Sequence, residues 1–162
     1  MSITIKAFRK LSLVLVVVLL AGQTIGCGQP SWHADLQPVS GECRVNGEPA
    51  VRAMILMHPK GHKTDVRESN PWAIVDETGT FHLSTYEPND GIPLGEYDVT
   101  ITWLQDPWNG LSKDRLKGKY RTKESPVCSI HIEEGTSELA PIEINLSGVL
   151  PALKNVGPAR AR

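Results

Sequence analysis

The stretch Glu96-Tyr97-Asp98-Val99-Thr100-Ile101-Thr102-Trp103-Leu104 decides the fold class of this chain. Large apolar side chains alternate with polar ones in it, with the period of an extended strand. Tyr97, Val99, Ile101 and Trp103 would therefore share one face, and the intervening aspartate and threonines would share the other. The alternation predicts a strand with one face in a hydrophobic core and the other face in water.

Six further short runs have a β-rich composition and are bounded by Gly, Pro, Asn and Asp. They cover residues 39–45, 53–58, 72–75, 80–85, 127–133 and 141–146. Asn46-Gly47 is typical of a hairpin turn, and Asp76-Glu77-Thr78-Gly79 places glycine where a left-handed backbone is needed. No run between residues 39 and 146 has a helical period, so the sequence predicts an all-β fold of seven strands.

The beginning of the chain has the layout of a bacterial lipoprotein signal. Three basic residues, Lys6, Arg9 and Lys10, precede an apolar run over residues 11–21. A run of this length rises about 16 Å as a helix, roughly half the thickness of the hydrocarbon layer, so it indicates a cleaved signal and not a membrane span. The tetrapeptide Thr24-Ile25-Gly26-Cys27 then resembles a lipobox, which predicts that Cys27 becomes the acylated first residue of the mature protein.

This interpretation gives a domain organisation and a location. We expect a signal peptide over residues 1–26, a spacer over 27–37, one β domain over 38–147 and a disordered tail over 148–162. The protein would be exported and lipid-anchored at the cell envelope. Because Gly28 and not aspartate follows Cys27, it would reach the outer membrane and face the periplasm where the bacterium has two membranes.

The charge of the mature chain argues against nucleic acid as a partner. Removing residues 1–26, which carry three basic and no acidic side chains, leaves 14 basic against 18 acidic side chains, a net charge of −4. A nucleic-acid-binding domain is expected to be basic. We therefore expect the partners to be the membrane, through the lipid anchor, and an anionic component or another protein of the envelope.

Four segments resemble one known domain family. Residues 39–49, 54–59, 75–83 and 95–100 are similar in cadence to the carboxypeptidase regulatory-like, transthyretin-like β-sandwich. Gly118-Lys119-Tyr120 and Ser125-Pro126-Val127 further resemble small predicted bacterial lipoproteins that carry one such domain. The resemblance implies a seven-stranded sandwich without catalytic residues, which serves as a scaffold for binding or packing. The chain departs from the family pattern at Cys43, where an apolar residue is usual.

Two cysteines are left once Cys27 is acylated. Cys43 and Cys128 both have the inward parity of their predicted strands, and exported proteins fold in an oxidising compartment. The economical interpretation is a disulfide between them. The alternative is two separate buried thiols that act as small apolar side chains.

The connection over residues 105–124 is the candidate binding loop. Residues 112–124 carry six basic and two acidic side chains, so this segment is +4 on a mature chain whose remainder is −8. Such polarity predicts a contact with an anionic partner. The candidate residues are Trp108, Lys113, Arg115, Lys117, Lys119 and Tyr120, with Arg121 and Lys123 completing the basic run. The alternative is a solvated loop whose aromatic side chains cover the sandwich.

The sequence supports metal binding and catalysis less well than it supports a binding loop. Met54, Met57, His58 and His62 have the soft character that suits exported copper, but the two methionines have opposite strand parity. An oxygen-ligand set of Asp76, Glu77, Asn89 and Asp90 consists of ordinary turn residues. No hydrolase motif is found in the sequence. We expect a non-catalytic, lipid-anchored binding or structural module without a cofactor, the alternative being an exported copper-handling lipoprotein.

Overall fold

The computed structural model describes residues 30–147, so the predicted signal, Cys27 and the predicted tail lie outside the described residues. Within this range the chain is all-β, as predicted, and it contains no helix that is long and apolar enough to cross a membrane. Each of the seven predicted runs contains a strand, and a two-residue strand is additional. The strands are β1 (Ser40–Val45), β2 (Glu48–Pro49), β3 (Met54–Pro59), β4 (Trp72–Ile74), β5 (Thr80–His82), β6 (Gly95–Thr102), β7 (Cys128–Ile132) and β8 (Ile142–Ile144).

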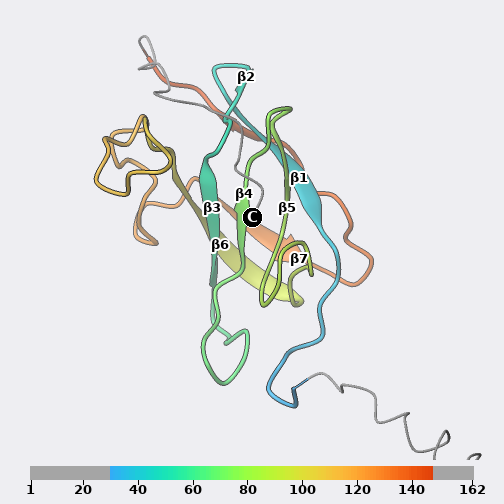
Figure 1. The fold of residues 1–162 in the computed structure, drawn as a ribbon. Coiled ribbons are helices and arrows are strands. Elements are labelled where there is room, and N and C mark those ends of the chain that lie inside the picture. The colour runs from blue at the N-terminus through green and yellow to red at the C-terminus, as the bar shows by residue number, and fades with distance from the viewer. Residues whose placement is uncertain (1–29, 148–162) are drawn as a thin grey trace, which may run out of the picture. The chain divides into compact units, whose positions relative to one another are not determined.

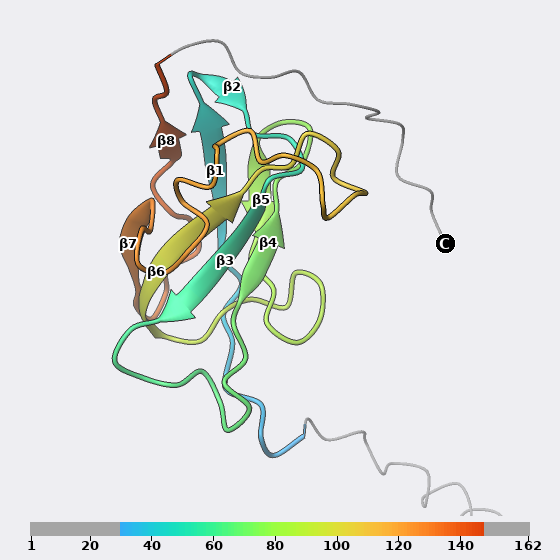
Figure 2. The same cartoon turned by 90° about the vertical axis from the view of Figure 1, so that its left-hand side faces the viewer.

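The strands form two four-stranded sheets that pack as a β-sandwich (Figure 1). In the first sheet β1 pairs antiparallel with β2 and β5, and parallel with β8. The second sheet has the order β4-β3-β6-β7 and is antiparallel throughout (Figure 2). The longest pairing joins β3 to β6, with Met54 opposite Thr102 and Pro59 opposite Tyr97. These two strands are the frame on which the candidate sites are built.

The core lies between the two sheets and follows the alternation seen in the sequence. On β6, Tyr97, Val99 and Ile101 are fully buried, and Trp103 follows them just beyond the strand. The Trp103 indole donates a hydrogen bond to the Val51 carbonyl at 2.8 Å, so its polar atom is satisfied inside the core. The facing sheet supplies Cys43, Val45, Phe81, Ile142 and Ile144 to the same core.

The outer face of β6 is less exposed to solvent than the alternation in the sequence predicted. Thr100 is buried, because the His58 side chain of the neighbouring strand lies on it with 2.9 Å between Nε2 and Oγ1. Thr102 and Asp98 are half-buried on the same face. The outer face of the second sheet is therefore partly covered. A candidate site lies at each end of strand β3 on this sheet.

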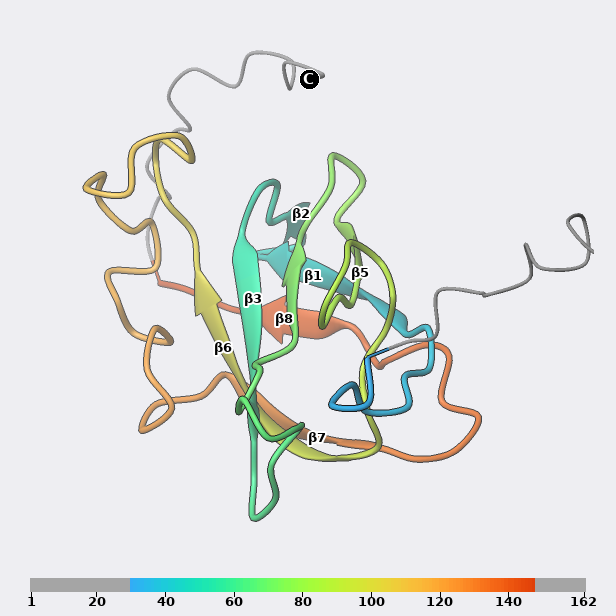
Figure 3. The same cartoon turned by 60° about the horizontal axis from the view of Figure 1, so that its bottom comes forward.

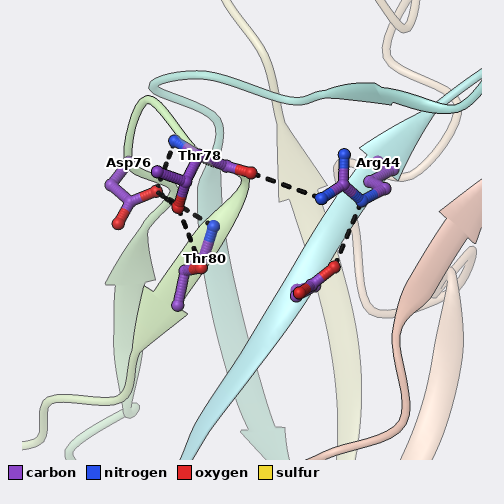
Figure 4. A network of polar contacts seen from close by, with 5 residues as sticks. Arg44, Asp76, Thr78 and Thr80 are labelled. Carbon is purple, nitrogen blue, oxygen red and sulfur yellow. Dashed lines mark hydrogen bonds and ion pairs between the residues drawn. The ribbon is translucent and has the colours of Figure 1, made fainter.

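Two turns have the left-handed backbone that the sequence predicted, but the hairpin at Asn46-Gly47 is made with the additional strand β2, because the next predicted run, β3, lies in the other sheet. Asn46 and Gly47 have φ angles of 53° and 80°, the left-handed pair that a two-residue hairpin between β1 and β2 requires. In the β4–β5 turn the Asp76 carboxylate accepts hydrogen bonds from the Thr78 amide at 2.8 Å, the Thr78 hydroxyl at 2.7 Å and the Thr80 amide at 3.0 Å (Figure 4). Arg44 on β1 donates to the Thr78 carbonyl at 3.4 Å and connects the turn to the sheet.

Candidate functional site

The connection over residues 105–124 lies beside β6, where β7 does not reach (Figures 1 and 3). It has no strand of its own, but its backbone bonds repeatedly to the segment that runs from Ile101 to Gln105. The Arg115 amide donates to the Trp103 carbonyl at 2.7 Å, and the Ile101 amide donates to the Tyr120 carbonyl at 2.8 Å. The connection is therefore a built extension of the sheet edge and not a free loop.

Asp114 organises the middle of this connection. Its carboxylate accepts hydrogen bonds from the backbone amides of Trp103 at 3.1 Å, Leu116 at 3.0 Å and Gly118 at 3.0 Å. Charged acceptors make the stronger class of hydrogen bond, and three donors converge on this one group. Asp114 thereby joins the connection to the end of β6 and fixes the turn that follows.

Arg115 does not belong to an exposed binding surface, which corrects the prediction made from the basic run. Only 8% of its surface is exposed, and its guanidinium carbon lies 3.5 Å from the centroid of the Trp103 ring. Burial lowers the pKa of the Arg115 guanidinium. Its neighbour Leu116 is also buried in the core. The physical reason is that a cation stacked on an indole replaces part of its hydration with the ring electrons.

The other predicted members of the binding loop are dispersed. Lys113, Lys117 and Lys119 are exposed, and the Lys119 ammonium lies 4.9 Å from the ring centroid of the half-buried Tyr120. Trp108 is 64% exposed at the other end of the connection. The structure therefore does not bring the predicted residues together into one surface.

An apolar groove occupies the Met54 end of β3. It has a volume of about 270 Å³, and the exposed side chains of Met54, Ile74 and Trp108 contribute to its walls. The Arg52 guanidinium carbon lies 5.2 Å from the Trp108 ring centroid and holds the ring over the sheet. The complete lining is Arg52, Met54, Ile74, Thr102, Leu104, Pro107 and Trp108.

A larger polar pocket occupies the opposite, His58 end of β3. It has a volume of about 380 Å³ and collects side chains from two separate parts of the chain. Its lining is His58, Pro59, His62, Lys63, Thr64, Glu68, Asn70 and Lys123. Lys63 forms an ion pair with Glu68, whereas Lys123 forms no ion pair with any residue between 30 and 147. Lys123 is therefore a lysine of this pocket without an ion pair among the described residues, although the neighbouring Glu124 senses its charge.

The charges around the pocket change the pKa of His58. Burial lowers the pKa of the His58 imidazole, and the positive charge of Lys123 lowers it further. Asp98 and Glu124 raise the pKa of His58, but their influence is smaller. His58 is consequently neutral at pH 7 and acts as a hydrogen-bonding group beside a cation.

The wall of the pocket depends on close packing around His62. A side chain at Gly95 would place its Cβ 2.6 Å from the His62 ring, so only glycine fits there, at a φ of 142°. The ring also meets Tyr97 edge-on with 5.2 Å between centroids, and its Nδ1 donates to the Lys60 carbonyl at 3.2 Å. This ring is therefore held in place mainly by strand β6.

The structure separates the residues considered as metal ligands. Met57 is fully buried in the core, whereas Met54 is exposed in the groove at the other end of β3 from His58 and His62. Among residues 30–147, no group of three or more His, Cys, Asp or Glu side chains is arranged to hold a metal ion.

The carboxylates considered as oxygen ligands serve backbone turns. Asp90 accepts hydrogen bonds from the amides of Thr85 at 2.6 Å, Tyr86 at 2.9 Å and Glu87 at 2.8 Å. Asp76 accepts its bonds in a different turn. Although partial burial raises the pKa of the Asp76 carboxyl, the hydrogen bonds from Thr78 and from backbone amides lower it overall. Both carboxylates are thus occupied by the chain itself.

The predicted disulfide between Cys43 and Cys128 is not formed, and both residues are free thiols. The inward parity was predicted correctly, since Cys43 is buried on β1 and Cys128 is half-buried against the core on β7. Burial raises the pKa of the Cys43 thiol to about 12 and also raises that of Cys128. The structure has the alternative arrangement, in which two thiols pack as small apolar side chains.

The last part of the predicted spacer packs against the domain. The His33 ring stacks on Tyr86 with 3.8 Å between centroids and an interplanar angle of 5°, and Trp32 meets Tyr86 edge-on at 5.3 Å. The Ala34 amide donates to the Tyr86 hydroxyl at 2.9 Å. The Arg67 guanidinium carbon lies 3.7 Å from the Trp32 ring centroid. The spacer prediction therefore missed this docking, for which the aromatic pair Trp32-His33 is the available sequence signal.

Comparisons with protein-family models, with curated proteins and with solved structures found no match for this chain. The resemblance to the carboxypeptidase regulatory-like family therefore stays a prediction from the sequence. The polar pocket was missed by sequence reasoning, because its lining comes from residues 58–70 and from Lys123, more than 50 residues later. The only local signal was the pair His58 and His62, which was considered as a metal motif.

Proposed function

We propose that this chain is a lipid-anchored, non-catalytic binding module of the bacterial cell envelope, and that its polar pocket holds an anionic group of an envelope component. The anchor is inferred from the charged start, the short apolar run and the Gly26-Cys27 junction. Two or three acyl chains would make attachment to the membrane stable, where a single chain would not. The resemblance to a family of β-sandwich scaffolds supports a binding role and not a catalytic one.

The observation that carries the proposal is the position of Lys123. It lines the polar pocket, and it has no ion pair with any described residue. Lys63 lies in the same pocket with its charge balanced by Glu68. A bound anion would contact the Lys123 ammonium, which is not held by an ion pair to a described residue, and the polar side chains around it.

The neutral side chains of the pocket complete this environment. His58 and Asn70 line it with hydrogen-bonding groups, and Thr64 contributes a hydroxyl that also lies within reach of the Tyr97 hydroxyl. Anions held by several charge-assisted or neutral donors are bound more strongly than anions on an open cationic surface. The phosphate of a lipid headgroup and the phosphate or carboxylate of a wall polymer share this chemistry.

The test compares two single lysine substitutions in the Cys27→Ser chain, which lacks the acceptor of the lipid. Cosedimentation is measured with vesicles that contain phosphatidylglycerol, with vesicles of phosphatidylcholine alone, and with isolated cell walls. Lys123→Ala should weaken binding to the anionic partner about tenfold, the expected cost of one charge-assisted hydrogen bond. Lys117→Ala removes the same charge from an exposed site outside the pocket and should leave binding nearly unchanged.

Two results would contradict the proposal. If Lys117→Ala weakens binding as much as Lys123→Ala, the attraction comes from the net charge of the segment and the pocket is not the site. If the Cys27→Ser chain binds neither anionic vesicles nor cell walls at low salt, the domain holds no anionic envelope component. The anchor is tested separately, since the wild-type chain should incorporate labelled fatty acid and begin at Cys27 by mass.

A further inference from the structure

The docked segment at the start of the domain limits how the domain can lie on a membrane. Trp32 is held by Arg67 of the β3–β4 loop and by the Tyr86 ring, and Gln37 exchanges two backbone hydrogen bonds with Ile92 at 3.1 and 3.0 Å. Residues 32–37 therefore belong to the folded domain. The sequence leaves four residues between Trp32 and Cys27. Five residues of extended chain span at most about 18 Å, so an acylated Cys27 would keep Trp32 close to the lipid headgroups.

From this covalent limit we infer that the β3–β4 loop, residues 60–71, faces the membrane and contacts the phosphate headgroups of its lipids. The inference rests on the proposed lipid anchor. Figures 1 and 2 show residues 30–38 and this loop at the same end of the sandwich, with the 105–124 connection toward the other end. The tether therefore selects one end of the domain as the side that faces the membrane.

The chemistry of this loop fits a lipid surface. Val66 is 82% exposed at its tip, next to the exposed Arg67, and Lys60 and Lys63 are exposed on the same loop. Residues 60–71 carry three basic and two acidic side chains, a net charge of +1, and Lys63 is paired with Glu68. An exposed apolar side chain beside a basic one is suited to the boundary between headgroups and acyl chains, where anionic lipids attract basic residues. Although partial burial raises the pKa of the Asp65 carboxyl, the hydrogen bonds that it accepts from the amides of Ser69 at 3.2 Å and Arg67 at 2.7 Å lower it overall, so Asp65 stays negatively charged within the loop.

The polar pocket lies at the same end, because His62 and Lys63 line it and belong to this loop. A domain oriented in this way would present the pocket toward the headgroups. The apolar groove with Trp108 would then be directed away from the bilayer. Trp32 and Trp108 thus mark the two ends of the domain and provide intrinsic probes of its orientation.

The experiment uses the full lipidated chain in vesicles of phosphatidylcholine and phosphatidylglycerol that contain a lipid with a nitroxide on its headgroup. The nitroxide quenches only tryptophans near the headgroups. We expect quenching in the wild type, loss of most of it in Trp32→Phe, and its retention in Trp108→Phe. The reverse pattern, or no quenching of protein that is present in the vesicle fraction, overturns the inference.

A second pair of variants tests the loop contact itself. Val66→Asp and Leu111→Asp each place an acid at a highly exposed apolar position, since Leu111 is 96% exposed in the 105–124 connection. Val66→Asp should reduce the quenching of Trp32, and Leu111→Asp should not. Equal quenching in both variants overturns the loop contact. Failure of the anchor is seen separately, as an unlipidated mass and absence from the vesicle fraction, and it overturns the proposed function together with this inference.

Discussion

Two neighbouring regions of the 105–124 connection both carry charged side chains, but one is buried in the fold and the other is exposed. Residues 114–116 are bound into the structure, with Asp114 bonded to three amides and Arg115 stacked on Trp103. Residues 117–124 carry four basic side chains, and all but the half-buried Tyr120 are exposed. The first region borders the end of the sheet near Trp103, and the second leads to the polar pocket at Lys123.

A run of like charges in the sequence therefore does not define one surface in the fold. Arg115 was grouped with the lysines because it lies in the same basic run. In the structure its guanidinium carbon lies 3.5 Å from the centroid of the Trp103 ring. Among the lysines of the run, Lys119 lies near an aromatic ring, that of Tyr120, at the longer distance of 4.9 Å. An arginine can stack on a ring and lose much of its hydration, whereas an ammonium keeps its hydration more strongly. Four experiments test the contrast, in order of the expected effect.

The largest effect is expected from Asp114→Ala. The substitution leaves three amides without their charged acceptor and should lower the free energy of unfolding by about 2–3 kcal/mol. Glu124→Ala is the control, because Glu124 is fully exposed in the second region and its removal should leave the free energy of unfolding nearly unchanged. Denaturant unfolding of both variants measures the difference. Equal stability would show that the first region is not built into the fold.

Arg115→Ala should destabilise the domain by about 1–2 kcal/mol, since it removes a buried cation from the face of Trp103 and the packing of its aliphatic stem. Lys117→Ala, the matched exposed substitution two residues later, should have an effect below about 0.5 kcal/mol. Denaturant midpoints and the fluorescence of Trp103 follow both changes. An equal effect of the two substitutions would contradict the contrast between the regions.

The second region should contribute to the acid sensitivity of His58, whose pKa is lowered first by burial and then by the charge of Lys123. Its pKa in the folded state lies below the ordinary value of 6.5, so the unfolded chain takes up the proton first. The associated stability is complete above pH 6.5 and is lost as the pH falls through the folded pKa. His58→Gln should flatten stability in this range, and Lys123→Ala should raise the pKa of His58 in an NMR titration. The titration also senses Asp98 and Glu124, which neither variant removes.

The smallest effect concerns reactivity and not stability. Cys43, with a pKa near 12 against an ordinary value of 9.0, should hold about a thousandfold less thiolate than a free cysteine at pH 8. Alkylation of the native protein should therefore be slow at Cys43 and faster at the half-buried Cys128, which follows the second region in the chain. Mass spectrometry after timed labelling measures both sites. Two unreactive cysteines in the denatured, unreduced protein would show a bridge that the structure does not contain.

Much of the fold was predictable because its signals are local. The alternation at Tyr97, Val99, Ile101 and Trp103 reports backbone geometry, and the Asn46-Gly47 pair specifies its own turn through its φ angles. The additional strand β2 was not predictable, since two residues carry no periodicity. The docking of residues 32–37 was also missed, because it depends on Tyr86 and Arg67 elsewhere in the chain.

The candidate site also combines features that are visible in the sequence with contacts that only the structure shows. His58, His62 and the basic run are visible in the sequence, as are the signal-like start and the acidic balance of the mature chain. That Lys123 joins His58 in one pocket, and that Arg115 leaves the basic surface to cover Trp103, follows from contacts between residues distant in the chain or carried by different elements. Local sequence patterns describe which face a side chain takes along its own strand. Only the packing of strands and connections against one another determines what that side chain meets and whether its charge reaches water.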